Sequence, residues 1–136
     1  MKEYISHSLA DTERIALEIA QSLKGNEVVA MLGGLGVGKT TFTRGFVSAF
    51  GVTDGVHSPT FAIVNEYQGD VDIYHFDMYR ITDEDDLYST GFFDYLGKGL
   101  IIIEWSENVL EFLPKDTVFI ELSYGSNENT RIIKRK

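Results

Sequence analysis

The sequence contains no cysteine, few prolines, a single tryptophan and little positive charge. The absence of cysteine excludes a disulfide framework and a thiolate metal site, and it favours a cytoplasmic location. No segment approaches the roughly 20 consecutive apolar residues that a membrane helix needs, and the first residues lack the apolar core of a signal peptide. The formal net charge of −9 repels a phosphate backbone, which argues against tight, direct binding of nucleic acid by this chain alone.

The length and composition indicate one folded unit. The 136 residues are 43% hydrophobic, which is ample for a globular core and leaves no material for a second one. Repeats, low-complexity stretches and Pro/Ser-rich linkers are also missing from the sequence. We therefore expect a single domain over residues 1–136.

The first half of the chain predicts a helix, a strand, a glycine loop and a second helix. Ile15, Ile19 and Leu23 recur at helical spacing, with Asp11 as the expected cap and Gly25-Asn26 as the expected stop. Residues 28–32 have the pattern of a buried strand, and the glycine-rich residues 33–38 follow it. A helix over residues 39–50 then places Phe42, Phe46 and Phe50 on one face.

The second half predicts a mixed sheet. Residues 60–67 and 71–80 are rich in β-forming residues and are joined by Gln68-Gly69-Asp70, which predicts an antiparallel hairpin. The apolar residues 100–103 are typical of a strand that is covered on both faces. Residues 106–113 have a helical pattern, and residues 117–124 and 131–134 are expected to be closing strands. The fold class is therefore α/β, with a mixed, mostly parallel sheet flanked by helices.

The glycine loop matches a known nucleotide-binding motif. Residues 33–40, Gly-Gly-Leu-Gly-Val-Gly-Lys-Thr, satisfy the P-loop pattern G-x-x-x-x-G-K-[ST] between a predicted strand and a predicted helix. Glycines let successive N–H groups turn toward phosphate oxygens, and the helix adds its positive amino end. Lys39 should reach the β- and γ-phosphates, and the Thr40 hydroxyl should bind Mg²⁺. The residues expected to bind ATP here are Gly33, Gly36, Val37, Gly38, Lys39, Thr40 and Thr41.

Two carboxylates are candidates for a role near the magnesium ion. Glu104 ends the apolar run 100–103, where a carboxylate can bind the metal or orient the attacking water. The alternative is that Glu104 caps the next helix together with Glu107. Asp77 lies on the strand face that becomes polar toward its end, and its alternative role is a surface ion pair with Arg80. Lys39, Asp77 and Glu104 are thus the predicted catalytic residues, with Thr40 and Glu104 as the predicted metal ligands.

Other side chains have less specific interpretations. His75 shares a strand face with Asp77, but no third protein ligand is evident, so a hydrogen-bonded structural role fits better than a metal site. Trp105, Tyr67, Tyr74 and Tyr79 could stack on a base, although packing in the core or at an interface is the commoner role of aromatic residues.

Four further segments, taken in order, resemble one bacterial family. They are Ser58-Pro59-Thr60-Phe61, Asn65-Glu66-Tyr67, His75-Phe76-Asp77-Met78-Tyr79-Arg80 and Ile103-Glu104-Trp105-Ser106-Glu107. Together with the P-loop, this succession is similar to TsaE, the ATPase of tRNA threonylcarbamoyladenosine biosynthesis. The resemblance runs from Thr12 to about Glu107, with a weaker match at Arg131.

The resemblance implies a P-loop ATPase that works with TsaD and TsaB, while tRNA is held mainly by those partners. It matches Lys39 and Thr40 to the phosphate and magnesium residues, and Glu104 to the magnesium-associated acid. Thr12 and Arg131 match positions that approach the nucleotide base. Two positions depart from the family pattern, because Gly34 replaces an acidic residue and Val37 replaces alanine. Neither change removes a backbone group that binds phosphate.

Three alternatives to an ATPase remain open at this stage. Residues 94–97 match the short GTPase pattern D-x-x-G. A GTPase would also need an N/T-K-x-D segment, which does not follow anywhere in the sequence. A small-molecule kinase would need a lid with clustered arginines, and the five arginines form no such cluster. A nucleotide-dependent binding module with little turnover is the third alternative. Residues 58–61 are also a hypothetical nucleotide-sensitive switch, because they follow the P-loop helix.

Overall fold

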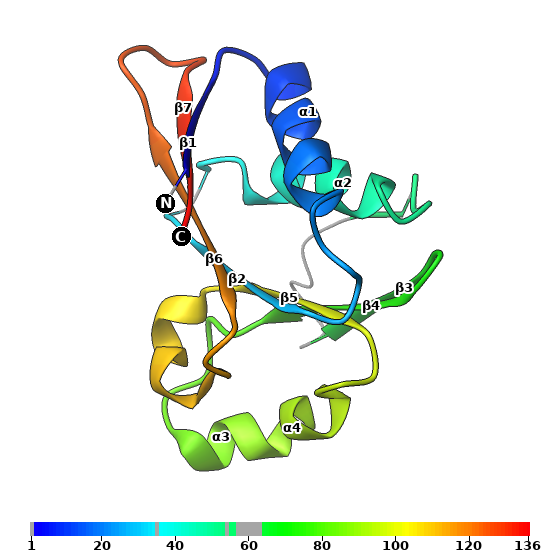
Figure 1. The fold of residues 1–136 in the computed structure, drawn as a ribbon. Helices are drawn as coiled ribbons and strands as arrows, with labels where there is room; N and C mark the ends of the chain where they lie inside the picture. Colours follow the sequence, from blue (N-terminus) through cyan, green and yellow to red (C-terminus); the bar gives the residue numbers. More distant parts are fainter. Residues whose placement is uncertain (1, 35, 54, 57–63) are drawn as a thin grey trace.

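The computed structural model describes residues 2–34, 36–53, 55–56 and 64–136 (Figure 1). Its strands are β1 (Lys2–Ser6), β2 (Val28–Leu32), β3 (Val64–Gln68), β4 (Asp72–Asp77), β5 (Leu100–Glu104), β6 (Val118–Tyr124) and β7 (Arg131–Arg135). Its α-helices are α1 (Leu9–Ala20), α2 (Lys39–Ser48), α3 (Glu84–Ser89) and α4 (Phe92–Tyr95), and two 3₁₀ helices are η1 (Ser106–Asn108) and η2 (Leu110–Phe112).

The described strands form one mixed sheet in the order β1-β7-β6-β2-β5-β4-β3. The four central strands β6, β2, β5 and β4 are parallel, whereas β7 and β3 run in the opposite direction. β3 and β4 form an antiparallel hairpin, in which Gln68 and Asp72 are the pair next to the turn. The predicted α/β architecture is thus confirmed, and so is the hairpin within the described residues.

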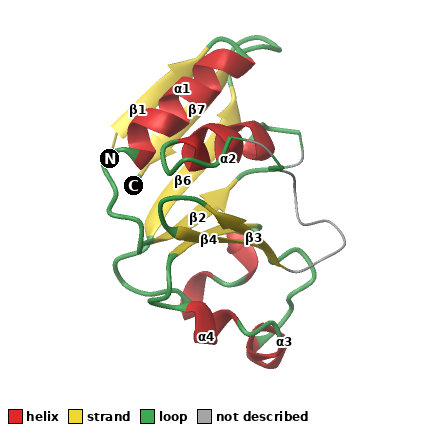
Figure 2. Ribbon diagram, turned by 90° about the vertical axis from the view of Figure 1, so that its right-hand side faces the viewer, coloured by secondary structure: helices red, strands yellow, loops and turns green. Residues whose placement is uncertain are grey.

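Helices cover the two faces of the sheet at different places, as Figure 2 shows. α1 and α2 pack on one face, where Ile15, Phe42, Phe46 and Ile102 belong to one buried apolar cluster. α3, α4 and the 3₁₀ helices lie on the other face, where Phe76, Phe92 and Ile103 belong to a second cluster. β5 is covered on both sides, which explains why Leu100–Ile103 is a continuous apolar run.

The first helix differs from the prediction at both ends. Ser8, rather than Asp11, is the cap of α1, and its side chain accepts a hydrogen bond from the Asp11 N–H. Ser8 has extended backbone dihedrals, as a residue that caps a helix must, whereas Asp11 already lies in the first turn. The helix also ends before Gly25, with Gln21 as its carboxyl-terminal cap.

Two other segments also differ from the sequence prediction. Residues 106–113 form two short 3₁₀ helices in place of one α-helix. β1 was not predicted, because its outward side chains are exposed and its alternation is weak; it is held by antiparallel pairing of Lys2–Ser6 with Arg131–Arg135. Pairing across the whole chain length cannot be inferred from a local pattern.

The carboxyl ends of the parallel strands β2, β5 and β4 meet at one edge of the sheet. The P-loop follows β2 at this edge, and α2 starts there.

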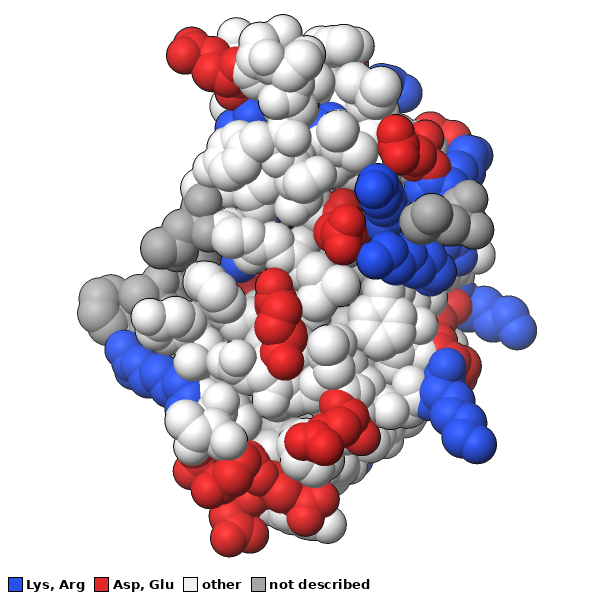
Figure 3. Space-filling model, turned by 90° about the vertical axis from the view of Figure 1, so that its left-hand side faces the viewer, with Lys and Arg blue, Asp and Glu red and all other residues white. Residues whose placement is uncertain are grey.

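No helix in the described residues is long and apolar enough to cross a membrane. Figure 3 shows acidic side chains gathered toward the end of the molecule that α3 occupies, and basic side chains interspersed with acidic ones elsewhere on that face.

Candidate functional site

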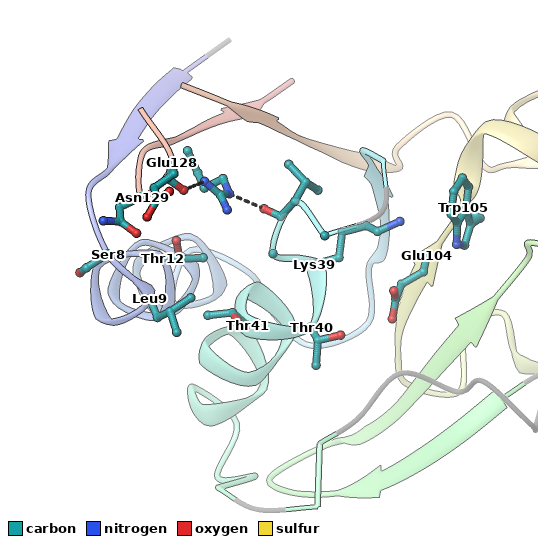
Figure 4. Close-up of a pocket in the computed structure, with 14 residues that line it drawn as sticks. Ser8, Leu9, Thr12, Lys39, Thr40, Thr41, Glu104, Trp105, Glu128 and Asn129 are labelled. Carbon is teal, nitrogen blue, oxygen red and sulfur yellow. Dashed lines mark hydrogen bonds between the residues drawn. The ribbon is translucent and has the colours of Figure 1, made fainter. Parts of the chain in front are cut away.

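A pocket of about 430 Å³ opens between the P-loop, α1 and the end of β5 (Figure 4). Its lining residues are Ser8, Leu9, Thr12, Gly36, Val37, Gly38, Lys39, Thr40, Thr41, Glu104, Trp105, Glu128, Asn129 and Arg131. Lys39, Thr40, Glu104 and Trp105 gather at one end, whereas Ser8, Thr12, Glu128 and Asn129 gather at the other. The pocket therefore has a P-loop end and an opposite end built by α1 and the turn before β7.

The P-loop backbone adopts a conformation that requires glycine. Gly33, Gly36 and Gly38 have φ values of 150°, 74° and 105°. At Gly33 a Cβ atom would also lie 2.8 Å from the carbonyl oxygen of Leu122. Gly38 precedes α2 without a side-chain cap, so the N–H groups of the first turn are not satisfied by a capping side chain. Such a helix terminus favours an anionic ligand.

Lys39 is only 7% exposed, and its ammonium group is held inside the site. Nζ donates a hydrogen bond to the Gly33 carbonyl oxygen at 2.9 Å. Nζ also lies 4.1 Å from the ring centroid of Trp105, close enough for a cation–π interaction. No carboxylate forms an ion pair with Lys39 in the described part of the chain. The positive charge thus remains available to an anion in the pocket.

Glu104 is the last residue of β5 and borders the pocket while being only 4% exposed. Its Oε2 atom is hydrogen-bonded to Nε2 of His75 at 2.5 Å. The Thr40 hydroxyl lies at the same end of the pocket (Figure 4). A hydroxyl and a carboxylate are the hard oxygen donors that suit Mg²⁺, which binds few protein ligands beside substrate phosphates. The chemistry of these two side chains fits a magnesium site that phosphate oxygens would complete.

The other catalytic candidate, Asp77, is not among the pocket-lining residues. Asp77 is the register partner of Glu104 on the adjacent strand, so the two residues lie side by side at the sheet edge. Its Oδ1 atom accepts a hydrogen bond from the Tyr79 N–H at 2.9 Å. Within the described residues, Asp77 forms no ion pair with Arg80. Its part in catalysis stays a prediction.

Two pocket residues at the opposite end are already engaged by the protein. The hydroxyls of Thr12 and Ser6 are 2.6 Å apart, and Ser6 donates to the Ser8 carbonyl oxygen. Arg131 donates from Nε to the Val37 carbonyl oxygen at 3.1 Å and from Nη1 to the Glu128 carbonyl oxygen at 2.7 Å. Both residues border the pocket and their polar groups organise its walls, while their approach to a nucleotide base stays a prediction.

One residue that touches the P-loop was not predicted to do so. The Glu107 Oε2 atom accepts a hydrogen bond from the Gly33 N–H at 3.1 Å. Gly33 itself is not among the described lining residues; its carbonyl oxygen accepts the hydrogen bond from Lys39 Nζ. The proximity of Glu107 to the glycine loop could not be inferred, since 74 residues separate the two. The predicted switch, residues 58–61, falls outside the described residues.

The pocket also contains lining residues without a sequence signal, namely Ser8, Leu9, Glu128 and Asn129. Trp105 contacts Lys39 and Tyr79 and lines the P-loop end of the pocket. It is the only non-glycine residue with positive φ, at 60°, in the described part of the chain. Such strained backbone is typical of functional sites.

His75 is fully buried, and both ring nitrogens have partners. The structure therefore agrees with the hydrogen-bonded interpretation of this histidine. No group of three or more His, Cys, Asp or Glu side chains that could hold a metal ion occurs in the described ranges.

Comparisons with known proteins identify the family. Residues 6–133 match the model of the family described as threonylcarbamoyl adenosine biosynthesis protein TsaE. The tRNA threonylcarbamoyladenosine biosynthesis protein TsaE of Aquifex aeolicus is 44% identical over 79% of this chain and 78% of its own length. Its Bacillus subtilis counterpart is 37% identical over 90% of this chain and 77% of its own length.

A solved structure agrees with these sequence matches. The crystal structure of YdiB from Bacillus subtilis superposes with a TM-score of 0.77 at 32% identity, and the match covers 97% of this chain and 82% of that one. The family and the P-loop fold together indicate a nucleotide-binding protein with a role in this tRNA modification pathway. The chain therefore belongs to the TsaE family.

Proposed function

We propose that this chain, acting as a single domain in the cytoplasm, binds ATP with Mg²⁺ and hydrolyses it in support of tRNA threonylcarbamoyladenosine synthesis by TsaD and TsaB. One observation carries the proposal: the pocket places the Lys39 ammonium, the Thr40 hydroxyl and the Glu104 carboxylate together at the amino end of α2. Their chemistry matches the three needs of phosphoryl transfer, which are charge, metal ligands and a group that handles the attacking water.

The geometry suggests how ATP would lie. The triphosphate occupies the P-loop end, where backbone N–H groups of residues 36–41 and the start of α2 favour an anion. Lys39 exchanges its contact with the Gly33 carbonyl oxygen for the β- and γ-phosphate oxygens. The nucleoside then extends toward Ser8, Thr12 and Asn129 at the other end of the pocket.

Hydrolysis transfers the γ-phosphoryl group to water. The water oxygen forms a bond to the γ-phosphorus, the bond from that phosphorus to the bridging oxygen breaks, and ADP departs. Glu104 orients the water and takes its proton, while Lys39 stabilises the charge that develops on the phosphoryl oxygens. A Mg²⁺ ion held by Thr40 and Glu104 would neutralise phosphate charge. Asp77, beside Glu104 at the sheet edge, is the second candidate acid.

The partner assignment is supported by family membership and by charge. A chain with a formal net charge of −9 is a poor ligand for tRNA, so tRNA would be held mainly by TsaD and TsaB.

The competing function is an ATP-dependent binding module with little turnover. It is favoured by Arg131 and Glu107, which tie distant segments to the P-loop, so nucleotide binding could order a docking surface.

Two variants test the proposal. Lys39→Ala should abolish ATP binding or reduce it more than tenfold, since it removes the only ammonium group among the described residues that line the pocket. Glu104→Gln should still bind ATP but release phosphate at least about 100-fold more slowly, as loss of a catalytic base does. Phosphate release is measured with and without TsaD and TsaB, and with GTP in place of ATP. Full turnover by Lys39→Ala would disprove the P-loop assignment, and no stimulation by the partners would favour the binding module.

A further inference from the structure

Three neighbouring strands carry a diagonal row of hydrogen-bonding side chains behind the pocket. Tyr67 on β3 is the register partner of Ile73, which places its side chain diagonally opposite His75 on β4. His75 in turn is the register partner of Ile102, which places it diagonally opposite Glu104 on β5. Because side chains two residues apart share a face, all three lie on the same side of the sheet.

The three side chains form a continuous hydrogen-bonded chain. The Tyr67 hydroxyl is 3.0 Å from Nδ1 of His75, and Nε2 of His75 is 2.5 Å from Oε2 of Glu104. Tyr67 is 8% exposed and His75 is completely buried, whereas Glu104 reaches the pocket. The row thus connects the edge strand β3 to one oxygen atom of the proposed catalytic carboxylate.

The donors and acceptors on the three side chains determine how this hydrogen-bonded row acts on Glu104. A carboxylate that acts as a general base is ionised and only accepts hydrogen bonds, so in that state the proton between the two groups is on Nε2 of His75. In a neutral ring with its proton on Nε2, Nδ1 is an acceptor, and the Tyr67 hydroxyl can supply the matching donor. The carboxylate therefore selects the ring form that donates to it, and the tyrosine hydroxyl stabilises that form by donating to Nδ1.

We propose that His75, supported by Tyr67, is a positioning residue for Glu104. Its hydrogen bond to Oε2 holds the carboxylate plane in one orientation. Oε1 is then left to bind water or the metal ion in the pocket. A buried partner of this kind lowers the freedom of the carboxylate before substrate arrives. His75 itself is sealed from the pocket and cannot touch ATP. This inference rests on the proposed function.

A purely structural role is the competing explanation, because the row also links three strands. The two explanations differ in their consequences. A structural link would contribute mainly to the free energy of unfolding. A positioning residue would change turnover and metal binding through Glu104, and its effect would vanish once Glu104 can no longer act.

The experiment compares His75→Leu, His75→Gln and Tyr67→Phe with the wild type in the full-length chain. His75→Leu should lower kcat by about 10- to 100-fold with the Kd for ATP changed less than threefold, since loss of a residue that orients a catalytic ligand has this size of effect. His75→Gln should restore most of the rate, because its amide can donate to Oε2. Tyr67→Phe should fall between these two variants.

Metal binding is a second readout that does not depend on turnover. Mn²⁺ affinity is measured by electron paramagnetic resonance with a non-hydrolysable ATP analogue, and His75→Leu should weaken it by about tenfold. Tyr74→Phe is the matched control. It removes a hydroxyl from β4, the strand that carries His75, but on the opposite face of the sheet. It should leave both kcat and Mn²⁺ affinity unchanged.

The decisive comparison is made in the Glu104→Gln background, where adding His75→Leu should slow turnover by less than twofold. A further tenfold loss there, or full activity of His75→Leu in the wild-type background, would overturn the positioning role. If His75→Leu does not fold, an inactive but folded His75→Gln would overturn it equally. Should Glu104→Gln itself keep full turnover, the proposed function fails first, so the two failures are distinguishable.

Discussion

The Nε atom of Arg131 donates a hydrogen bond to the carbonyl oxygen of Val37 at 3.1 Å, across 94 residues of sequence. The same guanidinium donates to the carbonyl oxygens of Glu128 and Thr130 and lies 4.6 Å from the centroid of the Tyr124 ring. Its position is therefore fixed by several contacts. In this way β7, the last strand along the chain, holds the middle of the P-loop.

Replacing Arg131 by glutamine should weaken ATP binding by about tenfold, because the loop loses a charge-assisted hydrogen bond that restrains it. Isothermal titration with a non-hydrolysable analogue measures the Kd. Arg135→Gln is the matched control on β7, since Arg135 contacts Ser22 and does not line the pocket. Equal Kd values for the two variants would mean that the contact with Val37 does not shape the loop.

Short-range patterns predicted most of the central fold. The P-loop has a sequence signature because glycine adopts the positive φ values of Gly36 and Gly38 at much lower cost than other residues. Leu100–Glu104 is recognisable as a strand because both of its faces are buried. These are local constraints, so they are visible in the local sequence.

The site contained features that no local pattern could predict. Glu107 reaches Gly33 and Arg131 reaches Val37 only because the sheet order places their strands and turns around β2. The chain from Tyr67 through His75 to Glu104 depends on the register of three strands, and a shift by one residue would break it. The sequence therefore indicates which residues are candidates for the site. It does not indicate which of them contact each other across the fold.

Trp105 should report nucleotide binding by fluorescence. It is the only tryptophan in the sequence, and Nζ of Lys39 lies 4.1 Å from its ring centroid. If the ammonium moves to the phosphates, the indole loses its cation and its emission should change in intensity or wavelength. Titration with ATP and Mg²⁺ measures the change. Lys39→Ala supplies the control, because its emission should resemble the bound state and respond little to nucleotide.

Gly45→Ala should destabilise the protein although alanine is the better helix former. A Cβ atom at Gly45 would clash with the backbone of Glu13, including its carbonyl oxygen, so α1 and α2 could not approach as closely. The clash should outweigh the roughly 1 kcal/mol that alanine gains in a helix, giving a net loss of about 1–3 kcal/mol in the free energy of unfolding. Urea unfolding monitored by circular dichroism measures it.

Gly34→Ala is the control for that substitution, because a Cβ atom at Gly34 meets no atom of the described residues within 4 Å. It should change the free energy of unfolding by less than about 0.5 kcal/mol. A Gly45→Ala variant as stable as the wild type would show that the two helices can separate slightly at no cost.

Glu27 should make the stability of the protein depend on pH below neutrality. Its carboxylate accepts hydrogen bonds from the N–H groups of Lys24, Gly25 and Asn26 at 2.9–3.1 Å, in the turn that leads into β2. Partial burial raises the pKa of this carboxyl, but the several backbone hydrogen bonds outweigh that effect and hold the pKa below its usual value of 4.5. The ionised form is therefore favoured by folding.

A depressed pKa in the folded state means that the stabilisation is fully present above the unfolded pKa and is lost as the pH falls through the folded value. Glu27→Gln should thus lower the free energy of unfolding by about 1 kcal/mol at pH 7, after allowance for the partial exposure of the group. The difference from the wild type should shrink as the pH falls below about 4.5. Urea unfolding of both proteins between pH 7 and pH 3 measures it. A difference that is constant over this range would show that charge on Glu27 contributes nothing to the turn.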